Sequence, residues 1–160
     1  MENSNHHSNN GNYTTFFLML GLSFVAMYIT MYLNTYAIDH VYFSLTRFYM
    51  VCLGISAMAV IMLLFMLKMY KNKKKNIAIL IGNLVLFISA LGLVRAQAPI
   101  VGDVFWLKGM IPHHSIAILT SERADLQDPE VKKLANDIIE AQRKEIEEMK
   151  AMIKRLENEK

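Results

Sequence analysis

The stretch FFLMLGLSFVAMYITMYL, residues 16–33, decides the fold of this chain. It lies within the uncharged segment Tyr13–Leu33, and two more uncharged stretches follow at Phe48–Leu67 and Ile77–Val94. A transmembrane helix needs about 20 mostly apolar residues, with roughly 17 as the lower limit. Three such helices buried in a soluble protein would need a polar shell far larger than the rest of the chain supplies. The sequence therefore predicts an all-α protein with three transmembrane helices.

The short loops between these spans differ in charge. KMYKNKKKN, residues 68–76, holds five lysines, whereas the loop between the first and second spans has only Arg47, at its edge. Lys and Arg are enriched in cytoplasmic loops. We therefore expect the N-terminus and the Lys68–Lys75 loop in the cytoplasm and residues 98–160 outside it. The expected location is a bacterial inner (plasma) membrane, with the C-terminal part in the periplasm or its equivalent.

Composition divides the chain into three parts. Residues 1–12, MENSNHHSNNGN, are rich in Asn and low in complexity, so we expect a disordered cytoplasmic leader. Residues 13–97 form the three-helix anchor in the lipid bilayer. Residues 101–160 carry ten Lys/Arg and twelve Asp/Glu, against seven and two in residues 1–100. Because this salt-rich third lacks the basic face of a nucleic-acid-binding domain, no nucleic-acid partner is expected.

Two helices joined by a short turn are predicted in residues 98–160. Asp103 can cap the first helix, and Pro112 inside it is expected to cause a kink or a new helix start. Residues 128–130, Asp-Pro-Glu, combine an N-cap, a proline at the first helical position and an acid in the first turn of the second helix. About five residues join the two helices, which forces them to run antiparallel. The expected unit is an extracytoplasmic helical hairpin.

The second helix of this hairpin carries a heptad pattern. Alternating steps of four and three connect Val131, Ala135, Ile138, Gln142, Glu145, Met149, Met152 and Leu156. Such a seam packs lengthwise on a neighbouring helix. Gln142 and Glu145 are polar where the pattern asks for Leu, and burying them costs free energy unless they find partners. Partners are therefore expected on the facing helix.

The facing helix offers one Met and two His at the matching level. Met110 and His114 stack on one face, and His113 lies about 100° round from His114. The side chains expected to converge on one layer are Met110, His113, His114, Gln142, Glu145 and Met149. Imidazole with thioether is a ligand set for copper, and imidazole with carboxylate suits zinc, iron or copper(II). The alternative is a polar layer that hydrogen-bonds to itself and fixes the register of a bundle.

Further candidates lie outside this layer. Four methionines at helical spacing could pass Cu(I) along the second span, although packing between helices is the favoured interpretation; they are Met58, Met62, Met66 and Met69. Asp39-His40 in the loop between the first two spans is either an auxiliary ligand pair or an interfacial polar turn. The aromatic residues that suit the outer membrane interface are Tyr32, Tyr36, Tyr42 and Trp106.

The motifs MIPHH at residues 110–114, DPEV at residues 128–131 and Q-x-x-E-I-x-x-M at residues 142–149 together resemble the DUF305 family. This is a mostly extracytoplasmic bacterial group of ferritin-like helical proteins, some of which bind copper. The resemblance covers about residues 100–156, and the three spans resemble the anchor of a membrane-bound subgroup. It implies that the ligands are Met110, His113, His114 and Met149.

The resemblance also implies an oligomer. Longer members of the family carry two such hairpins in tandem, which complete a four-helix bundle, whereas this chain has one hairpin, half of a ferritin-like bundle. A single hairpin with a heptad seam leaves an apolar face uncovered. We therefore expect a homodimer or higher oligomer formed through the C-terminal hairpin.

The expected function is metal binding, with copper sequestration or handover outside the cytoplasm. A non-catalytic assembly protein, whose hairpin mediates oligomerisation, is the alternative. A ferritin-like di-metal oxidase is disfavoured because such sites use Glu-x-x-His motifs, which the sequence lacks, and Glu145 is the only acid on the seam. No enzymatic activity is therefore expected.

Overall fold

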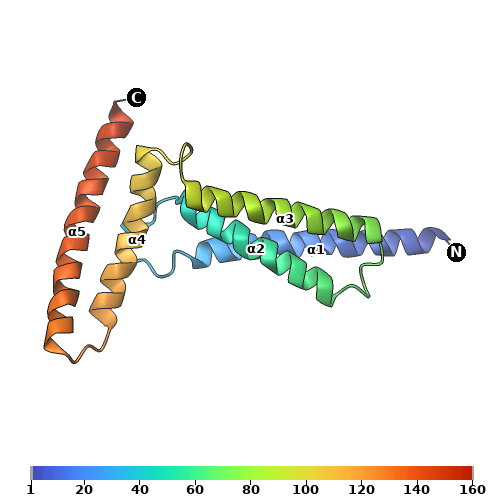
Figure 1. Ribbon diagram of the computed structural model, residues 1–160, viewed down its shortest axis with the longest axis horizontal. Helices are drawn as coiled ribbons and strands as arrows, with labels where there is room; N and C mark the ends of the chain where they lie inside the picture. The colour runs from blue at the N-terminus through green and yellow to red at the C-terminus, as the bar shows by residue number, and fades with distance from the viewer. Residues whose placement is uncertain (1, 160) are drawn as a thin grey trace. The chain divides into compact units, whose positions relative to one another are not determined.

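The computed structural model describes residues 2–159, with side chains from Asn12 onward, and this part of the chain is all-helical (Figure 1). Its elements are α1 (Glu2–Thr30), the 3-10 turn η1 (Ile38–His40), α2 (Leu45–Phe65), α3 (Lys73–Ala96), α4 (Asp103–Arg123) and α5 (Pro129–Asn158). The prediction of an all-α fold is confirmed. The chain divides into two compact units: α1 to residue 29 with residues 48–97, and residues 30–47 with the chain from residue 98 onward.

Three helices of the first unit are long and apolar enough to cross a membrane. These candidate spans are Asn12–Thr30, Leu45–Phe65 and Lys73–Ala96, as the sequence predicts within a few residues. Only 11% of the apolar window in α1, and the same share in α3, is buried inside the protein. Helices of a soluble domain bury their apolar faces in a core, whereas a lipid-facing helix leaves them at its surface. The exposed apolar surface therefore suits a bilayer.

The helix α1 begins at Glu2, within residues 1–12, where the sequence predicts a disordered leader. The apolar span supplies a helix nucleus, and adding residues to an existing helix costs far less free energy than starting one. The backbone of residues 2–12 therefore continues α1. Residue 1 and the side chains of residues 2–11 lie outside the described residues.

The loop between α2 and α3 is closed by polar and aromatic contacts. The Tyr13 hydroxyl donates to Asn76 Oδ1 at 2.6 Å, and Asn76 Nδ2 donates to the Tyr70 carbonyl at 2.7 Å. Asn72 caps α3 by accepting from the Lys75 amide. These contacts tie the lysine-rich loop to the N-terminal end of the α1 span.

The expected methionine stripe is interrupted. Met58 and Met62 lie in α2, but this helix ends at Phe65, so Met66 and Met69 belong to the turn that follows. A single helical face through all four thioethers is therefore wrong. The interpretation as packing residues stays a prediction.

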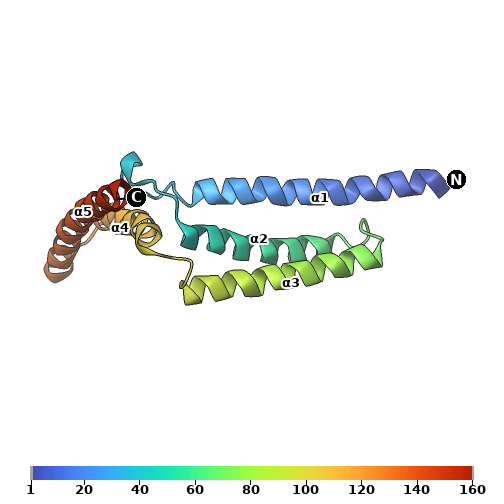
Figure 2. The same ribbon diagram turned by 90° about the horizontal axis from the view of Figure 1, so that it is seen from above.

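In the second unit, α4 and α5 pack against each other and run in opposite directions (Figures 1 and 2). The Lys108 ammonium lies 2.6 Å from the Glu157 carboxylate near one end, and Arg143 lies 3.4 Å from Glu122 toward the other. Between them lies a hydrophobic core of Leu107, Ile111, Ile118, Ile146, Met149 and Ile153.

The ends of these two helices follow the local sequence, with one exception. Asp128 caps α5 by accepting from the amides of Glu130 and Val131 at 2.9 and 3.0 Å, as expected. The N-cap of α4 is Gly102, so Asp103 lies in the first turn instead. There its negative charge interacts favourably with the positive end of the helix dipole. The helix α4 continues through Pro112, and no new helix starts there.

The core face of α5 differs from the predicted seam in its second half. Ile146 and Ile153 are buried, at 1% and 5% exposure, whereas Met152 is 45% exposed and Glu145 is also exposed. Both patterns have steps of three and four, so periodicity permits either. The observed face buries two isoleucines and leaves the Glu145 carboxylate in water, which gains apolar burial and avoids desolvating a charge. The expectation that Glu145 is a buried seam residue is wrong.

Candidate functional site

His114 on α4 and Glu145 on α5 form the centre of the candidate metal site. His114 Nε2 lies 2.8 Å from Glu145 Oε2, and His114 Nδ1 lies 2.9 Å from the carbonyl oxygen of Met110, one turn earlier. A carbonyl only accepts, so Nδ1 carries a proton. The other ring nitrogen, Nε2, then faces the Glu145 carboxylate, and a cation can lie between the two atoms.

Gln142 and His113 lie beside this pair. Gln142 Nε2 is 3.5 Å from Glu145 Oε2, at the limit of a hydrogen bond. The rings of His113 and His114 have centroids 5.9 Å apart, and His113 is exposed. The His114 side chain is mostly buried, whereas the Glu145 side chain is half exposed. The group is consequently open to solvent on one side, where an ion could enter.

The two predicted thioether ligands lie in the hydrophobic core. Met149 is buried with Ile146 and Ile153, and Met110 packs against the same cluster. The structure thus brings together His114, Glu145 and Gln142, with His113 next to them, while both methionines take part in packing. Among the side chains that the structure describes, from Asn12 to Glu159, no group of three or more His, Cys, Asp or Glu residues is close enough to hold a metal ion.

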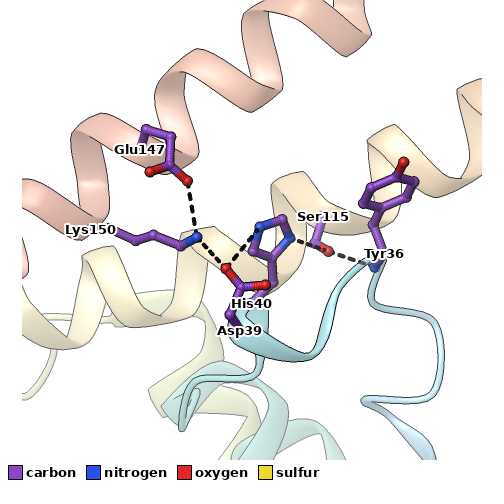
Figure 3. A network of polar contacts seen from close by, with 6 residues as sticks. All are labelled: Tyr36, Asp39, His40, Ser115, Glu147 and Lys150. Carbon is purple, nitrogen blue, oxygen red and sulfur yellow. Dashed lines mark hydrogen bonds and ion pairs between the residues drawn. The ribbon is translucent and has the colours of Figure 1, made fainter.

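A polar network missed by the sequence analysis connects the loop after α1 to α4 (Figure 3). The Tyr36 amide donates to Ser115 Oγ at 2.7 Å, and His40 Nδ1 lies 3.0 Å from the same oxygen. Ser115 is fully buried, and His40 is 8% exposed. One sequence feature could have indicated this network. Ser115 is a polar residue on the core face of α4, one turn after Ile111 and three residues before Ile118.

Asp39 extends this network to α5 (Figure 3). The Lys150 ammonium lies 2.6 Å from Asp39 Oδ2 and 3.0 Å from Glu147 Oε1. The hydrogen bond from Lys150 lowers the pKa of Asp39 below its ordinary value, although partial burial opposes this. Because an ammonium already binds this carboxylate, a metal ion at Asp39-His40 would have to displace Lys150. In this arrangement the pair holds the loop on α4 and α5.

A serine, a histidine and an aspartate also form the catalytic triad of many hydrolases. The geometry of Ser115, His40 and Asp39 does not support that chemistry. Ser115 Oγ has no exposed surface and accepts the Tyr36 amide, so a substrate carbonyl cannot reach it. Asp39 Oδ2 lies 4.0 Å from His40 Nε2, beyond hydrogen-bond distance. The network is structural.

The other end of the loop is fixed by Arg47. Its Nη2 donates to the Pro112 carbonyl of α4 at 3.2 Å, its Nη1 donates to the Met31 carbonyl, and its guanidinium stacks on the Tyr32 ring at 4.4 Å. The Tyr32 hydroxyl accepts from the Ser44 amide at 3.0 Å. Residues 30–47 therefore belong to the same unit as α4 and α5.

Membership of one unit constrains the topology. A loop that contacts α4 and α5 must lie on the same side of a membrane as these helices. The chain between them contains two candidate spans, α2 and α3, and two crossings return it to that side. The contacts of His40 and Arg47 are thus consistent with α2 and α3 both crossing the membrane.

The buried His40 predicts a dependence of stability on pH. Burial lowers the pKa of His40 below its ordinary value of 6.5, although the Asp39 charge opposes this shift. As pH falls below 6.5, the unfolded chain binds a proton before the folded chain does, so stability decreases. Asp39 does not interfere, since the stability that its lowered pKa contributes is present above pH 3.8 and is lost only as the pH falls below that value. We expect the melting temperature of the detergent-purified protein to decrease between about pH 7 and pH 5.

The variant His40→Gln is the control for this experiment. Its side-chain carbonyl can still accept from Ser115, but it does not titrate. The decrease with pH should be smaller than in the wild type. Equal decreases in both proteins would show that another group causes the effect.

Two comparisons with known proteins find sequences similar to this chain. Residues 93–159 match the family described as "Domain of unknown function (DUF305)". The chain is 37% identical over 139 residues to "Uncharacterized protein L153" of Acanthamoeba polyphaga mimivirus, which covers 85% of this chain and 89% of that relative. No solved structure matches. Because the similarity to this relative extends well beyond α4 and α5 and the family match covers both, the chain belongs to the DUF305 family.

Proposed function

We propose that this protein is a membrane-anchored metal-binding protein that holds copper, or a similar transition metal, at His114 and Glu145, in sequestration or handover. The observation that carries the proposal is the 2.8 Å contact between His114 Nε2 and Glu145 Oε2 at a level open to solvent. Bonds of about 2.0–2.2 Å from an imidazole and a carboxylate to one ion place the two donor atoms roughly 3 Å apart. A metal ion can therefore bind between these two atoms with little movement of either side chain.

The surroundings of His114 support this assignment. Histidine ligands usually donate their second ring N–H to a carbonyl or carboxylate, which fixes the ring and directs the other nitrogen at the metal. The Met110 carbonyl plays this part for His114, at 2.9 Å. Imidazole and carboxylate donors suit copper(II) and zinc, while Met110 and Met149 would favour Cu(I) if the core opened to them.

The site needs further donors. His114 and Glu145 are two ligands, whereas protein zinc sites use three or four. His113 and Gln142 can supply them after a change of rotamer. A second copy of the chain can supply them as well, through a homo-oligomer in which two α4–α5 pairs complete a four-helix bundle.

For the location, we propose that the Lys68–Lys75 loop faces the cytoplasm and that α4 and α5 lie outside it, at a bacterial plasma membrane. The charge difference between the loops supports this orientation. Metal ions that arrive from outside a cell would meet α4 and α5 first.

Metal content tests the proposal directly. The detergent-purified protein is loaded with Cu(II), desalted and analysed for bound copper. We expect the double variant His113→Ala/His114→Ala to bind at least about 100-fold more weakly, since even outer-shell changes cost 10–100-fold in affinity. The matched control is His6→Ala/His7→Ala, which removes another adjacent histidine pair. Equal copper content in all three proteins would contradict a site at His114.

An assembly protein without a metal is the second candidate, and exposed apolar residues on α5 favour it. Val131 and Leu134 are 46% and 58% exposed, and both line a shallow groove that continues to Ile138. This function is preferred if the double-histidine variant binds copper as the wild type does and the purified protein is a stable dimer. A copper-free monomer contradicts both candidates.

A further inference from the structure

We propose that the first turn of α4 docks into the lipid headgroup layer through Phe105 and Trp106. The partner is the bilayer surface on the side where residues 30–47 lie. The inference rests on α1, α2 and α3 crossing a membrane and is independent of metal binding.

The first observation is the exposure of two adjacent aromatic rings. Phe105 is 44% and Trp106 is 54% exposed, whereas Leu107 and Ile111, on the other face of the same helix, are buried against α5. Ile100, just before the helix, is 47% exposed. A Trp side chain has an apolar body and one polar N–H, a combination that suits headgroup depth.

The second observation is the short connection to the membrane. The candidate span α3 ends at Ala96 and α4 begins at Asp103, so residues 97–102 join them. Six extended residues reach at most about 20 Å. These six residues, Gln-Ala-Pro-Ile-Val-Gly, carry no charge. The first turn of α4 therefore stays close to the end of a span.

The third observation is a second attachment of α4 near a span end. Arg47 lies in the first turn of α2, and its Nη2 donates to the Pro112 carbonyl of α4 at 3.2 Å. Ser44, one residue before α2, lies next to Gly109, since a Cβ added there would meet Ser44 Oγ at 3.5 Å. The first half of α4 thus contacts Ser44 and Arg47, which lie where the chain enters α2.

The other expected interface aromatics are engaged within the unit. Tyr32 stacks on Arg47, Tyr36 binds α4 through its amide and lies near Arg143 through its ring, and Tyr42 packs against the α4–α5 core. Trp106 retains a free aromatic surface, together with Phe105. Of the four aromatic residues that the sequence analysis expects at the membrane interface, Trp106 is the one whose exposed ring needs a partner.

The single tryptophan of the chain makes the test direct. The protein is reconstituted into phosphatidylcholine vesicles that contain lipids brominated at shallow or deep acyl positions. We expect the emission of Trp106 to be blue-shifted relative to tryptophan in water and to be quenched more strongly by shallow than by deep bromines. The matched control is Trp106→Phe/Lys144→Trp, which moves the tryptophan to an exposed position on α5 opposite its core face. Neither brominated lipid should quench the emission of this tryptophan.

Each other outcome overturns the proposal. A Trp106 that bromolipids do not quench lies away from the bilayer, and a blue shift without quenching indicates a protein partner instead. Equal quenching of both tryptophans would show that α5 touches lipid as much as α4 does. The copper measurement on His113→Ala/His114→Ala is separate, so failure of one proposal leaves the other to be judged on its own result.

Discussion

The variant Ile146→Ala is expected to lower the stability of the α4–α5 unit by about 2–5 kcal/mol, the range for truncating a buried isoleucine. Ile146 is 1% exposed and packs in the core with Ile111 and Met149. Removing its outer carbons leaves a cavity, and the surrounding side chains lose dispersion contacts as well as apolar burial. The measurement is urea unfolding of the detergent-purified protein, followed by circular dichroism.

Two neighbouring substitutions are the controls. Glu145→Ala and Met152→Ala alter exposed positions that the predicted seam places in the core, so each should change stability by less than about 1 kcal/mol. Loss of the partly exposed ion pair with His114 is a contribution of that small size. If Glu145→Ala or Met152→Ala destabilised the protein more than Ile146→Ala did, the observed register of α5 would be wrong.

The variant Ser115→Ala is expected to release the loop between α1 and α2 from α4. The Tyr36 amide and His40 Nδ1 would both lose their partner at a buried position. An unsatisfied buried polar group costs about 1–3 kcal/mol, and the volume lost is a single oxygen atom. We expect a lower stability and faster proteolysis within residues 30–47, measured by urea unfolding and by limited digestion from the outer side of proteoliposomes.

Ser121→Ala on the same helix is the matched control. Ser121 is only half-buried and lines the shallow groove with Leu134 and Ile138, so its truncation should leave the stability within about 0.5 kcal/mol of the wild type and the digestion unchanged. Equal digestion of the loop in Ser115→Ala and the wild type would contradict the anchoring role of Ser115.

The partly predicted candidate site shows where sequence reasoning reaches its limit. The match between the levels of His114 and Glu145 follows from two helix lengths and a short turn, and the 2.8 Å contact confirms it. The prediction that Glu145 is buried is wrong, because two overlapping apolar patterns, both with steps of three and four residues, run along α5. Choosing between the two patterns requires the apolar area that each face of α5 buries against α4. The sequence of α5 alone does not give that area.

Local chemistry was sufficient to predict the three candidate spans and the start of α5. The uncharged runs are long enough to become helices whatever they pack against, because a span satisfies its backbone hydrogen bonds within itself. Asp128 caps α5 through amides two and three residues away, so its role is also readable from adjacent residues. The sequence by itself thus determined the helices, the candidate spans and the family resemblance.

The tertiary structure alone decided how the loop between α1 and α2 is used. His40 meets Ser115 across 75 residues of sequence, and Arg47 meets Pro112 across 65. Such contacts depend on how the folded chain brings distant elements together. The residue pattern within either element does not predict them. The same cause separates Ile146 from Glu145: burial is a property of two surfaces together, whereas a sequence pattern describes only one.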